Sequence, residues 1–294
     1  MKNNKIEDQK KLSGKDGFEK FYEKIFSDRW ENLKKSLLDE SVYAEISHDG
    51  CEKYFLDPAS VFASSLLPVE NAEKILDLCA APGGKTLVLS SRMNENSVLF
   101  SNERSFQRKQ RLFQVCKSSL PEKIFNKVKI SCSDGKKWCL SQKECFDSIL
   151  LDAPCSSERH VLKDSKYLNS WSPSRIKSLA MEQWALISSA YRLLKPSGFL
   201  LYSTCALSFQ ENDGIIERLL KKFSDSSLVY EKSEPSFSDE IQKFCKMPFI
   251  PVFERTPFGF HILPDKNKGS GPIWFSLIHN THLQFDFQGF YFLL

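Results

Sequence analysis

The stretch that decides the fold is Leu76-Asp77-Leu78-Cys79-Ala80-Ala81-Pro82-Gly83-Gly84-Lys85-Thr86, which follows an apolar run and opens a helical pattern. Its small residues would let a ligand approach the backbone, and the N-terminus of the following helix supplies free N–H donors. The stretch is neither a Walker loop nor a GxGxxG loop, so it indicates neither a nucleoside triphosphate nor a dinucleotide. A tight strand–helix turn without a ligand is the alternative; we favour a cofactor loop.

Outward from this loop, short apolar runs alternate with helical patterns. The runs bounded by turn signals are residues 75–78, 97–100, 128–130, 148–151 and 199–202. One helix is predicted from Ser105 to Ser119, and a longer one begins at Ser172-Pro173 and ends at Lys195-Pro196. This alternation predicts an α/β fold with a doubly wound, Rossmann-like parallel sheet. Residues 260–263 and 273–278 flank a polar loop and predict a hairpin that closes the sheet.

An amphipathic helical arm is predicted before the first strand. Between Gly17 and Leu38, apolar residues recur at three- and four-residue intervals. We expect the arm to pack on the main domain through Phe21, Ile25 and Trp30, because an exposed apolar stripe is rare on a monomer. The expected division is an arm at 1–50, a main domain at 51–280 and a C-terminal tail at 281–294.

Composition narrows the class of protein. The chain has 294 residues, 41% of them hydrophobic, and a net charge of only +4, so a polyanion would be met by local patches. Its nine cysteines are scattered without a CxxC pair, so we expect neither a metal site nor a disulfide framework. No apolar run of about 18 residues exists and the first residues lack a secretory signal. We therefore expect a cytoplasmic protein without a membrane segment.

Polar and sulfur-containing residues follow several of the predicted strands. Glu103 follows the second strand, where an acidic side chain can accept hydrogen bonds from ribose hydroxyls. Asp152-Ala153-Pro154-Cys155 ends the fourth strand, and Ser203-Thr204-Cys205 ends the fifth. The carboxyl ends of parallel strands open into one crevice, so both thiols should lie near the cofactor loop. The alternative is that they are ordinary buried core residues.

The string from Asp77 to Thr86 resembles the cofactor motif of the Nop/Sun (RsmB-like) RNA cytosine-5 methyltransferases, and the resemblance covers nearly the whole chain. It implies a class I methyltransferase fold with S-adenosylmethionine as the cofactor. The residues that it implies for the cofactor site are Cys79, Ala80, Ala81, Pro82, Gly83, Gly84, Lys85, Glu103, Arg108, Asp134, Gly135 and Asp152. Cys79 fits packing better than chemistry, and Asp134-Gly135 matches the adenine side.

The chemistry of this family explains two thiols. Cytosine C5 is a poor nucleophile, and a thiolate that adds to C6 creates an enamine whose C5 can accept a methyl group. The resemblance implies that Cys205 forms this covalent adduct, that Cys155 assists elimination and that Asp152 holds the cytosine edge. The four residues implied for catalysis are Cys205, Cys155, Asp152 and Lys85. DNA cytosine-5 methyltransferases use the Pro-Cys thiol as nucleophile, so the presence of both cysteines favours RNA.

Further motifs concern the substrate. The segments 26–30, 134–138 and 154–162 resemble the mitochondrial ribosomal-RNA branch and its transfer-RNA relative, which implies a targeting protein partner by analogy. Ribosomal RNA is favoured; transfer-RNA methylation and a non-catalytic RNA-binding assembly factor are the alternatives. Residues 210–213 are interpreted mainly as a helix cap, and the Arg159-His160 pair is left open between an RNA contact and a structural role. The basic residues between Arg104 and Lys129 fit a solvated helix face better than a phosphate contact.

Overall fold

The central sheet confirms the predicted doubly wound α/β class. The structure is a computed structural model that describes residues 12–237 and 239–282; the predicted C-terminal tail falls outside it from residue 283 onward. Five parallel strands lie in the order β5-β4-β3-β6-β7. Their bounds are β3 Lys74–Asp77, β4 Val98–Asn102, β5 Val128–Ser131, β6 Phe146–Asp152 and β7 Leu194–Thr204. Because β7 begins at Leu194, it takes in the turn residues that were expected to separate it from the preceding helix.

The sheet continues with antiparallel strands, as the predicted hairpin requires. β12 pairs with β7 on one side, and with both β11 and β8 on the other. β10 then pairs with β11 at the edge. The bounds are β8 Ser226–Leu228, β10 Glu254–Arg255, β11 Phe260–Ile262 and β12 Ile273–Asn280.

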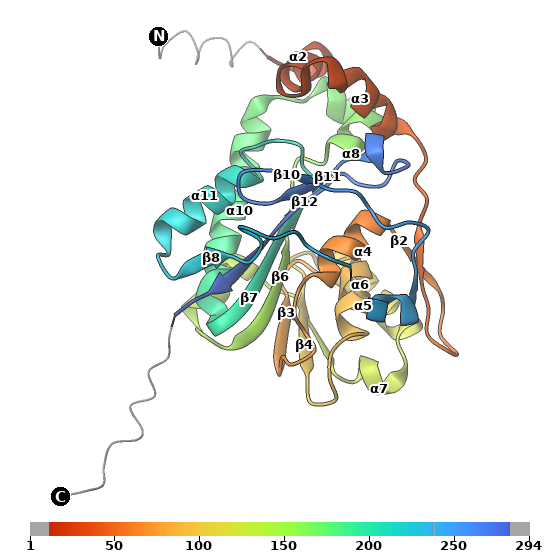
Figure 1. The fold of residues 1–294 in the computed structure, drawn as a ribbon, viewed down its shortest axis with the longest axis vertical. Coiled ribbons are helices and arrows are strands. Elements are labelled where there is room, and N and C mark those ends of the chain that lie inside the picture. Colours follow the sequence, from red (N-terminus) through yellow and green to blue (C-terminus); the bar gives the residue numbers. More distant parts are fainter. Residues whose placement is uncertain (1–11, 238, 283–294) are drawn as a thin grey trace, which may run out of the picture.

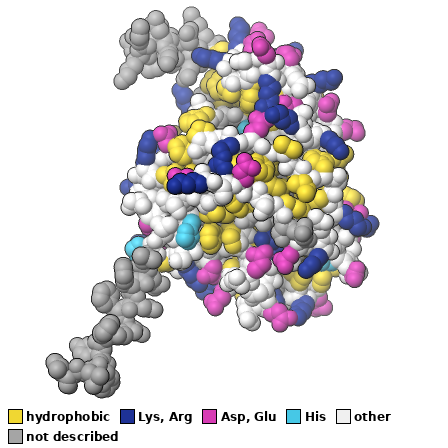
Figure 2. Space-filling view, viewed as in Figure 1, with side chains coloured by type: hydrophobic (Ala, Val, Ile, Leu, Met, Phe, Trp, Pro, Cys, Tyr) yellow, Lys and Arg dark blue, Asp and Glu magenta, His cyan; other side chains and the backbone are white. Residues whose placement is uncertain are grey.

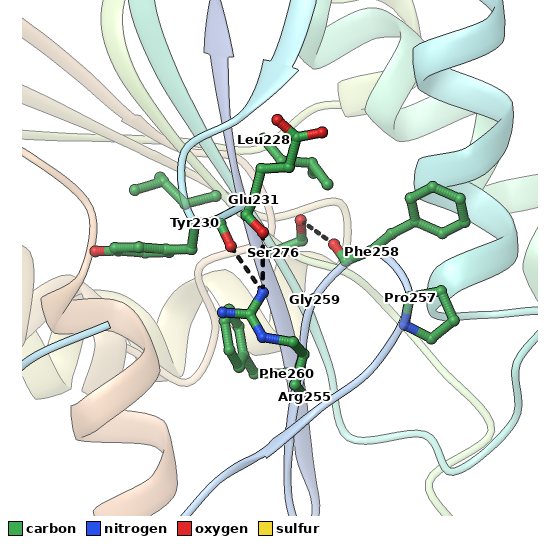
Figure 3. A pocket seen from close by; sticks show the side chains of 10 residues that line it. Leu228, Tyr230, Glu231, Arg255, Pro257, Phe258, Gly259, Phe260 and Ser276 are labelled. Atoms are coloured by element: carbon green, nitrogen blue, oxygen red, sulfur yellow. Dashed lines mark hydrogen bonds between the residues drawn. The ribbon is translucent and has the colours of Figure 1, made fainter. Parts of the chain in front are cut away.

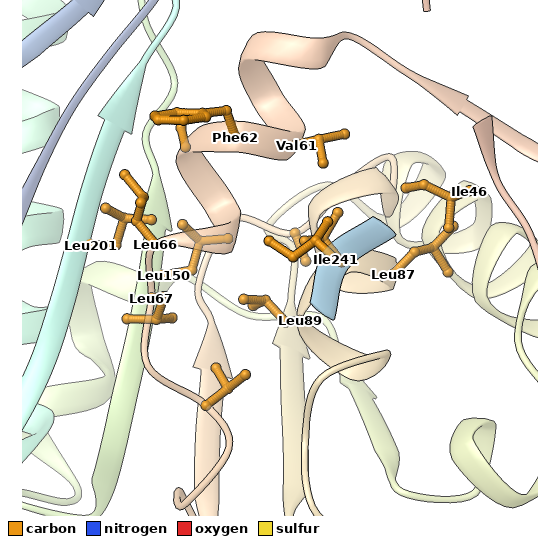
Figure 4. Close-up of a cluster of buried hydrophobic side chains, with 14 of the residues drawn as sticks. Ile46, Val61, Phe62, Leu66, Leu67, Leu87, Leu89, Leu150, Leu201 and Ile241 are labelled. Carbon is orange, nitrogen blue, oxygen red and sulfur yellow. The ribbon is translucent and has the colours of Figure 1, made fainter. Parts of the chain in front are cut away.

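Helices cover both faces of the sheet (Figure 1). One layer contains α4 Pro58–Ser65, α5 Gly84–Ser90, α6 Phe106–Ser119 and α7 Glu122–Phe125. The other contains α10 Pro173–Leu193 and α11 Asp213–Lys222, with the 3-10 helix η2 Gly135–Leu140 packed on α10. Ile75 faces the first layer and Leu76 the second, as the two-residue period of a strand demands. Figure 4 shows the first core, where leucines of β6 and β7 meet α4 and α5.

The arm packs on the main domain, and its buried side chains form one side of a third hydrophobic cluster. It consists of α2 Gly14–Phe26, the 3-10 helix η1 Ser27–Arg29 and α3 Trp30–Leu38. Phe21 is partly buried in the cluster and Trp30 fully, but Ile25 is 44% exposed, so its predicted contact is wrong. The turn at η1 brings Trp30 back onto Tyr22, with ring centroids 5.2 Å apart.

Arg29 connects the arm to the far part of the chain. Its Nη1 lies 2.7 Å from Glu254 Oε2, and its Nε lies 2.6 Å from Asp265 Oδ2. The remaining helical segments near the arm are α8 Glu158–Lys163, α9 Ser165–Asn169 and the 3-10 helix η4 Pro264–Lys266. In Figure 1 the arm lies over this end of the molecule.

A second, small sheet was not predicted. Its strands are β1 Ala44–Ile46, β2 Tyr54–Leu56 and β9 Cys245–Lys246, with the 3-10 helix η3 Asp239–Lys243 before β9. β2 covers the start of α5: a Cβ on Gly84 would lie 2.8 Å from Leu56 Cδ1 and 2.9 Å from Tyr54 Cε1. The strands are too short to give a recognisable alternation, and β9 joins from 200 residues away.

The surface is mixed in character. Figure 2 shows hydrophobic side chains in several patches on one face, with positive and negative side chains between them. Within residues 12–237 and 239–282, no helix has the length and apolar character needed to span a membrane.

Candidate active site

A pocket lies where the predicted crevice was expected, at the carboxyl ends of the parallel strands. It is lined by Leu78, Cys79, Asn102, Glu103, Arg104, Arg108, Asp134, Gly135, Pro154, Glu182 and Leu186. Five of the residues implied for the cofactor site are among them, namely Cys79, Glu103, Arg108, Asp134 and Gly135. Sequence reasoning missed Glu182 and Leu186, because α10 has the pattern of any packed helix and carries no motif.

Glu103 has the properties of a ligand acceptor in this pocket. The residue is only 3% exposed, and its Oε1 accepts a hydrogen bond from Ser105 N at 2.9 Å. Its Oε2 is buried and accepts no hydrogen bond from the residues that the structure describes, although Arg108 Nη1 lies 3.2 Å away. A buried carboxylate oxygen without a donor is costly unless a ligand supplies one. The position fits a ribose hydroxyl of a nucleoside cofactor.

The glycines of the cofactor loop serve helix packing. Gly83 has φ +122, and a Cβ there would lie 3.0 Å from Val115 Cγ1 of α6. A side chain such as valine at this position would therefore strain the loop and displace α6. Ala80, Ala81, Pro82 and Gly84 do not line the pocket either. The carbonyl of Ala81 accepts a hydrogen bond from Arg108 Nη2 at 2.8 Å, which ties α6 to the loop.

Beside this pocket, the two predicted cysteines are in contact. The Sγ atoms of Cys155 and Cys205 lie 2.9 Å apart, and both residues are partly buried free thiols. The register of β6 and β7 places Asp152 opposite Ser203, whose Oγ donates to Asp152 Oδ1 at 2.9 Å. Lys85 Nζ donates to Asp152 Oδ2 at 2.7 Å. The four residues implied for catalysis therefore lie together, at the ends of three neighbouring strands.

Charges around the thiols are unevenly distributed. Burial lowers the pKa of Lys85, but the charge and hydrogen bond of Asp152, then the charge of Cys205, outweigh it and raise this pKa. Lys85 therefore stays a cation. The pKa of Cys155 is raised well above its ordinary value by the hydrogen bond to Cys205, by burial and by nearby negative charges, including Glu211 and Glu158. Cys155 therefore keeps its proton, and its S–H can donate to Cys205 Sγ.

Two buried carboxyl groups, those of Glu158 and Glu211, lie near Cys155. Glu158 is 1% exposed and Glu211 is not exposed at all. Burial and the charge of Glu211 raise the pKa of Glu158 to about 7. Glu158 was missed because it is an ordinary charged residue in a short helix; its only sequence signal was its place three residues after Cys155.

The segment after Cys205 does not cap α11 as expected. The side chain of Asn212, at the N-cap position, makes no capping hydrogen bond. Instead Asn212 Oδ1 accepts from Thr204 Oγ1 at 2.6 Å, and its Nδ2 donates to Ala206 O at 2.9 Å. These bonds fix the backbone on both sides of Cys205.

Arg159 has a structural role. Its Nη2 donates to the carbonyls of Gly269 and Gly271 at 2.6 and 2.7 Å, so it binds the turn before β12. His160 is exposed, and its ring lies 4.9 Å from that of Tyr167.

A second pocket lies at the antiparallel edge of the sheet, away from this site (Figure 3). The Arg255 guanidinium occupies it, donating to the carbonyl of Tyr230 at 2.9 Å and packing 4.7 Å from the Phe260 ring centre. Its lining includes none of the residues implied for cofactor or catalysis. We interpret it as a structural contact between β10 and the segment after β8.

Comparisons with known proteins show the family of the chain. The family model described as 16S rRNA methyltransferase RsmB/F matches residues 64–269. Ribosomal RNA small subunit methyltransferase F of Erwinia tasmaniensis is 36% identical over 57% of this chain and 36% of its own length. The protein of the same name from Escherichia fergusonii is 36% identical over 72% of this chain and 50% of its own length. The chain thus spans about half the length of these curated relatives, or less.

A solved structure supports the fold. The crystal structure of NSun6 from Pyrococcus horikoshii with SFG aligns with a TM-score of 0.60 at 23% identity, covering 79% of this chain and 54% of that one. The matched segment 64–269 contains the cofactor loop, Asp152 and both cysteines of the pair. The chain belongs to the RsmB/F family of 16S rRNA methyltransferases, within the Nop/Sun group that its cofactor loop resembles.

Proposed function

We propose that this protein transfers a methyl group from S-adenosylmethionine to C5 of a cytosine in RNA, with ribosomal RNA as the substrate. The observation that carries the proposal is the contact of Cys155 with Cys205 beside the Lys85–Asp152 ion pair. Family membership supports the reaction type, and Glu103, whose buried Oε2 accepts no hydrogen bond from the described residues, supports a ribose-bearing cofactor. When bound, that cofactor supplies an electrophilic methyl group on a sulfonium.

Cys205 is the nucleophile in this proposal. Its thiolate adds to C6 of a cytosine that has left its stack, forming an S–C6 bond and shifting an electron pair to C5. The Lys85 cation interacts electrostatically with Cys205, at the position where the attacking sulfur lies. Asp152 is fixed by Lys85 and Ser203, so its carboxyl group can face the N3–N4 edge of the base.

Cys155 assists the second half of the reaction. After C5 has accepted the methyl group, a base such as water takes the C5 proton and the C5–H electron pair forms the C5–C6 double bond. The S–C6 bond then breaks and returns its electron pair to Cys205. A neighbouring thiol that keeps its proton stabilises the departing thiolate by donating a hydrogen bond to it. Cys155 has both the proton and the required distance of 2.9 Å.

Within the family, we propose the mitochondrial ribosomal-RNA type as the nearest branch, with a targeting protein as partner. Support comes from the segment after Cys155, where the RsmB-like enzymes have a glycine-rich loop. Here Ser157 has φ 53, a left-handed conformation that glycine adopts without strain. All nine cysteines lie in the described residues and are free thiols, which suits a reducing compartment such as the cytoplasm.

The test is methyl transfer in vitro. Purified protein is incubated with S-adenosylmethionine and unmodified transcripts of small-subunit ribosomal RNA and, separately, of transfer RNA. Nucleoside mass spectrometry should detect 5-methylcytosine in the ribosomal transcript, and Cys205→Ala should abolish it. Methylation of transfer RNA alone would correct the substrate; no 5-methylcytosine in either RNA, with ribosomal RNA still bound, would favour an assembly factor. Bisulfite sequencing of RNA from cells lacking the gene would locate the cytosine.

A further inference from the structure

Tyr22 brings a buried hydroxyl from the arm to the back of the active site. Its side chain is fully buried, and its ring stacks on Trp30. Its OH donates a hydrogen bond to Glu158 Oε1, across a sequence separation of 136 residues. Burial, then the charge of Glu158, raises the pKa of Tyr22 well above its ordinary value, so the hydroxyl remains a donor. Through this bond the arm contacts the segment that carries Cys155.

The two buried glutamates connect the loops of the two cysteines. Glu158 belongs to the helix after Cys155, but its Oε2 accepts from the backbone of Leu207, two residues after Cys205, at 3.1 Å. Glu211 belongs to the segment after Cys205, but its Oε1 accepts from the backbone of Ser156, next to Cys155, at 2.8 Å. Each carboxyl group thus holds the opposite loop, and the two contacts cross.

The Ser156 hydroxyl closes the network. It contacts Glu158 Oε1 and lies 2.6 Å from Glu211 Oε2. A hydroxyl has one proton, so it can donate to only one of two carboxylates. The second contact needs a proton on a carboxyl group, and Glu158, whose pKa is about 7, is the group that holds it. All hydrogen bonds of the network can therefore form only when Glu158 is protonated between the hydroxyls of Tyr22 and Ser156.

We propose that Glu158, held by Tyr22 of the arm, is a positioning residue that fixes the Cys155 loop against the Cys205 loop. The conformation of Ser157 supports this, because a non-glycine residue at φ 53 persists only where its surroundings hold it. Packing of the arm then determines the contact between the thiols. The inference rests on the proposed function for its effect on methyl transfer, but the geometry can be tested without RNA.

The test compares Tyr22→Phe with Tyr191→Phe. Both substitutions delete one buried hydroxyl, since Tyr191 OH donates to Asn280 Oδ1 at 3.3 Å and lies outside the cysteine network. Each protein is treated with iodoacetamide at about pH 6.5, below the Glu158 pKa of about 7, and mass spectrometry follows alkylation of each cysteine. Tyr22→Phe should loosen the Cys155 loop and raise alkylation of Cys155 by about threefold or more, whereas Tyr191→Phe should leave it at the wild-type rate.

Methyl transfer gives the second readout. Tyr22→Phe should lower kcat by about tenfold, which is the loss of one hydrogen bond to a charged group. KM for S-adenosylmethionine should not change, because the cofactor pocket contains neither Tyr22 nor Glu158. Glu158→Gln should act in the same direction and also speed alkylation of Cys155, because one of the two oxygens that accept from Tyr22 and Leu207 becomes an NH2 donor.

The outcomes separate the two proposals. Wild-type alkylation rates in Tyr22→Phe and in Glu158→Gln would overturn the positioning role, whether or not the protein methylates RNA. Altered alkylation in a protein that never methylates RNA would refute the proposed function and keep the positioning role. Should Tyr22→Phe fail to fold by circular dichroism, Ser156→Ala, which removes the bridging hydroxyl alone, must give the same increase at Cys155; an unchanged rate there would equally reject the inference.

Discussion

The two cysteines of the pair have neighbours of opposite charge. Cys205 faces the Lys85 cation, whereas Cys155 is backed by Glu158 and Glu211. Both thiols are free, partly buried, and placed at the ends of adjacent parallel strands. Burial and strand position therefore do not distinguish them. What distinguishes them is the charge nearby: a lysine cation beside Cys205, and two buried carboxyl groups beside Cys155 that help to raise its pKa.

Replacing each of the two cysteines by alanine should have the largest effect of the tests described here, and the two variants should differ. Cys205→Ala leaves nothing to add to C6, so methyl transfer and the protein–RNA adduct should both be lost completely. Cys155→Ala should still form the adduct and accumulate it on denaturing electrophoresis, because release is slowed. Cys51→Ala, a partly buried cysteine on the loop between β1 and β2, serves as control. An adduct with Cys205→Ala but none with Cys155→Ala would reverse the roles.

Removing the arm takes the Tyr22 hydroxyl away from Glu158 and also removes the packing of the arm on the main domain. Deleting residues 1–38 takes away Phe18, Tyr22, Trp30, Leu33 and Leu37, all buried in the third cluster. The free energy of unfolding should fall by about 5 kcal/mol or more, since each such side chain contributes about 1.5–3 kcal/mol. Thermal melting followed by circular dichroism measures this. The matched control is Ile25→Ala, an exposed position, which should cost less than about 0.5 kcal/mol. A truncated protein as stable as the full chain would show that the arm is an independent module.

Lys85→Met tests the cationic side. It removes the charge near Cys205 and leaves Asp152 without its ion pair, so single-turnover methyl transfer should slow by about a hundredfold. Lys195→Met is a close control: Lys195 also pairs with an aspartate, Asp147, at 2.7 Å, but at the beginning of β6 and β7, away from the crevice. That variant should transfer methyl groups at the wild-type rate. Equal losses in both variants would mean that Lys85 only stabilises the fold.

The smallest expected effect is on the pH dependence of stability. Burial raises the pKa of Asp77, beneath Lys85, to about 7. A carboxyl whose pKa is raised on folding stabilises the fold fully below its unfolded value near 4, and this contribution is lost as the pH rises through about 7. Asp77→Asn should remove this pH-dependent loss. In denaturant titrations, the free energy of unfolding of the variant relative to that of the wild type should be on the order of 2 kcal/mol higher at pH 8 than at pH 4.

Glu254 should show the opposite sign. Its hydrogen bond with Arg29 lowers its pKa to about 2, so its contribution is present above pH 4.5 and lost as the pH falls through 2. Glu254→Gln should therefore destabilise the protein at neutral pH and have no effect in strong acid. A shared sign for Asp77→Asn and Glu254→Gln would contradict the assigned burial of Asp77.

Sequence reasoning succeeded where the signal is local. The strand runs, the loop from Asp77 to Thr86 and the cysteines at strand ends follow from short-range patterns and from the geometry of parallel sheets. The crossed bonds of Glu158 and Glu211 could not be predicted, because they depend on which side chains meet across 49 and 55 residues. Gly83 shows a subtler limit: the residue type was recognised, but whether it serves a ligand or a neighbouring helix depends on the direction of an absent Cβ.

Arg29 can form its ion pairs only late in the synthesis of the chain. Its acceptors, Glu254 and Asp265, emerge from the ribosome 225 and 236 residues after it. The carbonyls that Arg159 binds, at Gly269 and Gly271, emerge later still. During synthesis the arm therefore cannot complete its contacts until nearly all of the described chain has been translated. Nascent chains stalled before residue 250 should be cut by protease within α2, and those released after residue 271 should be protected.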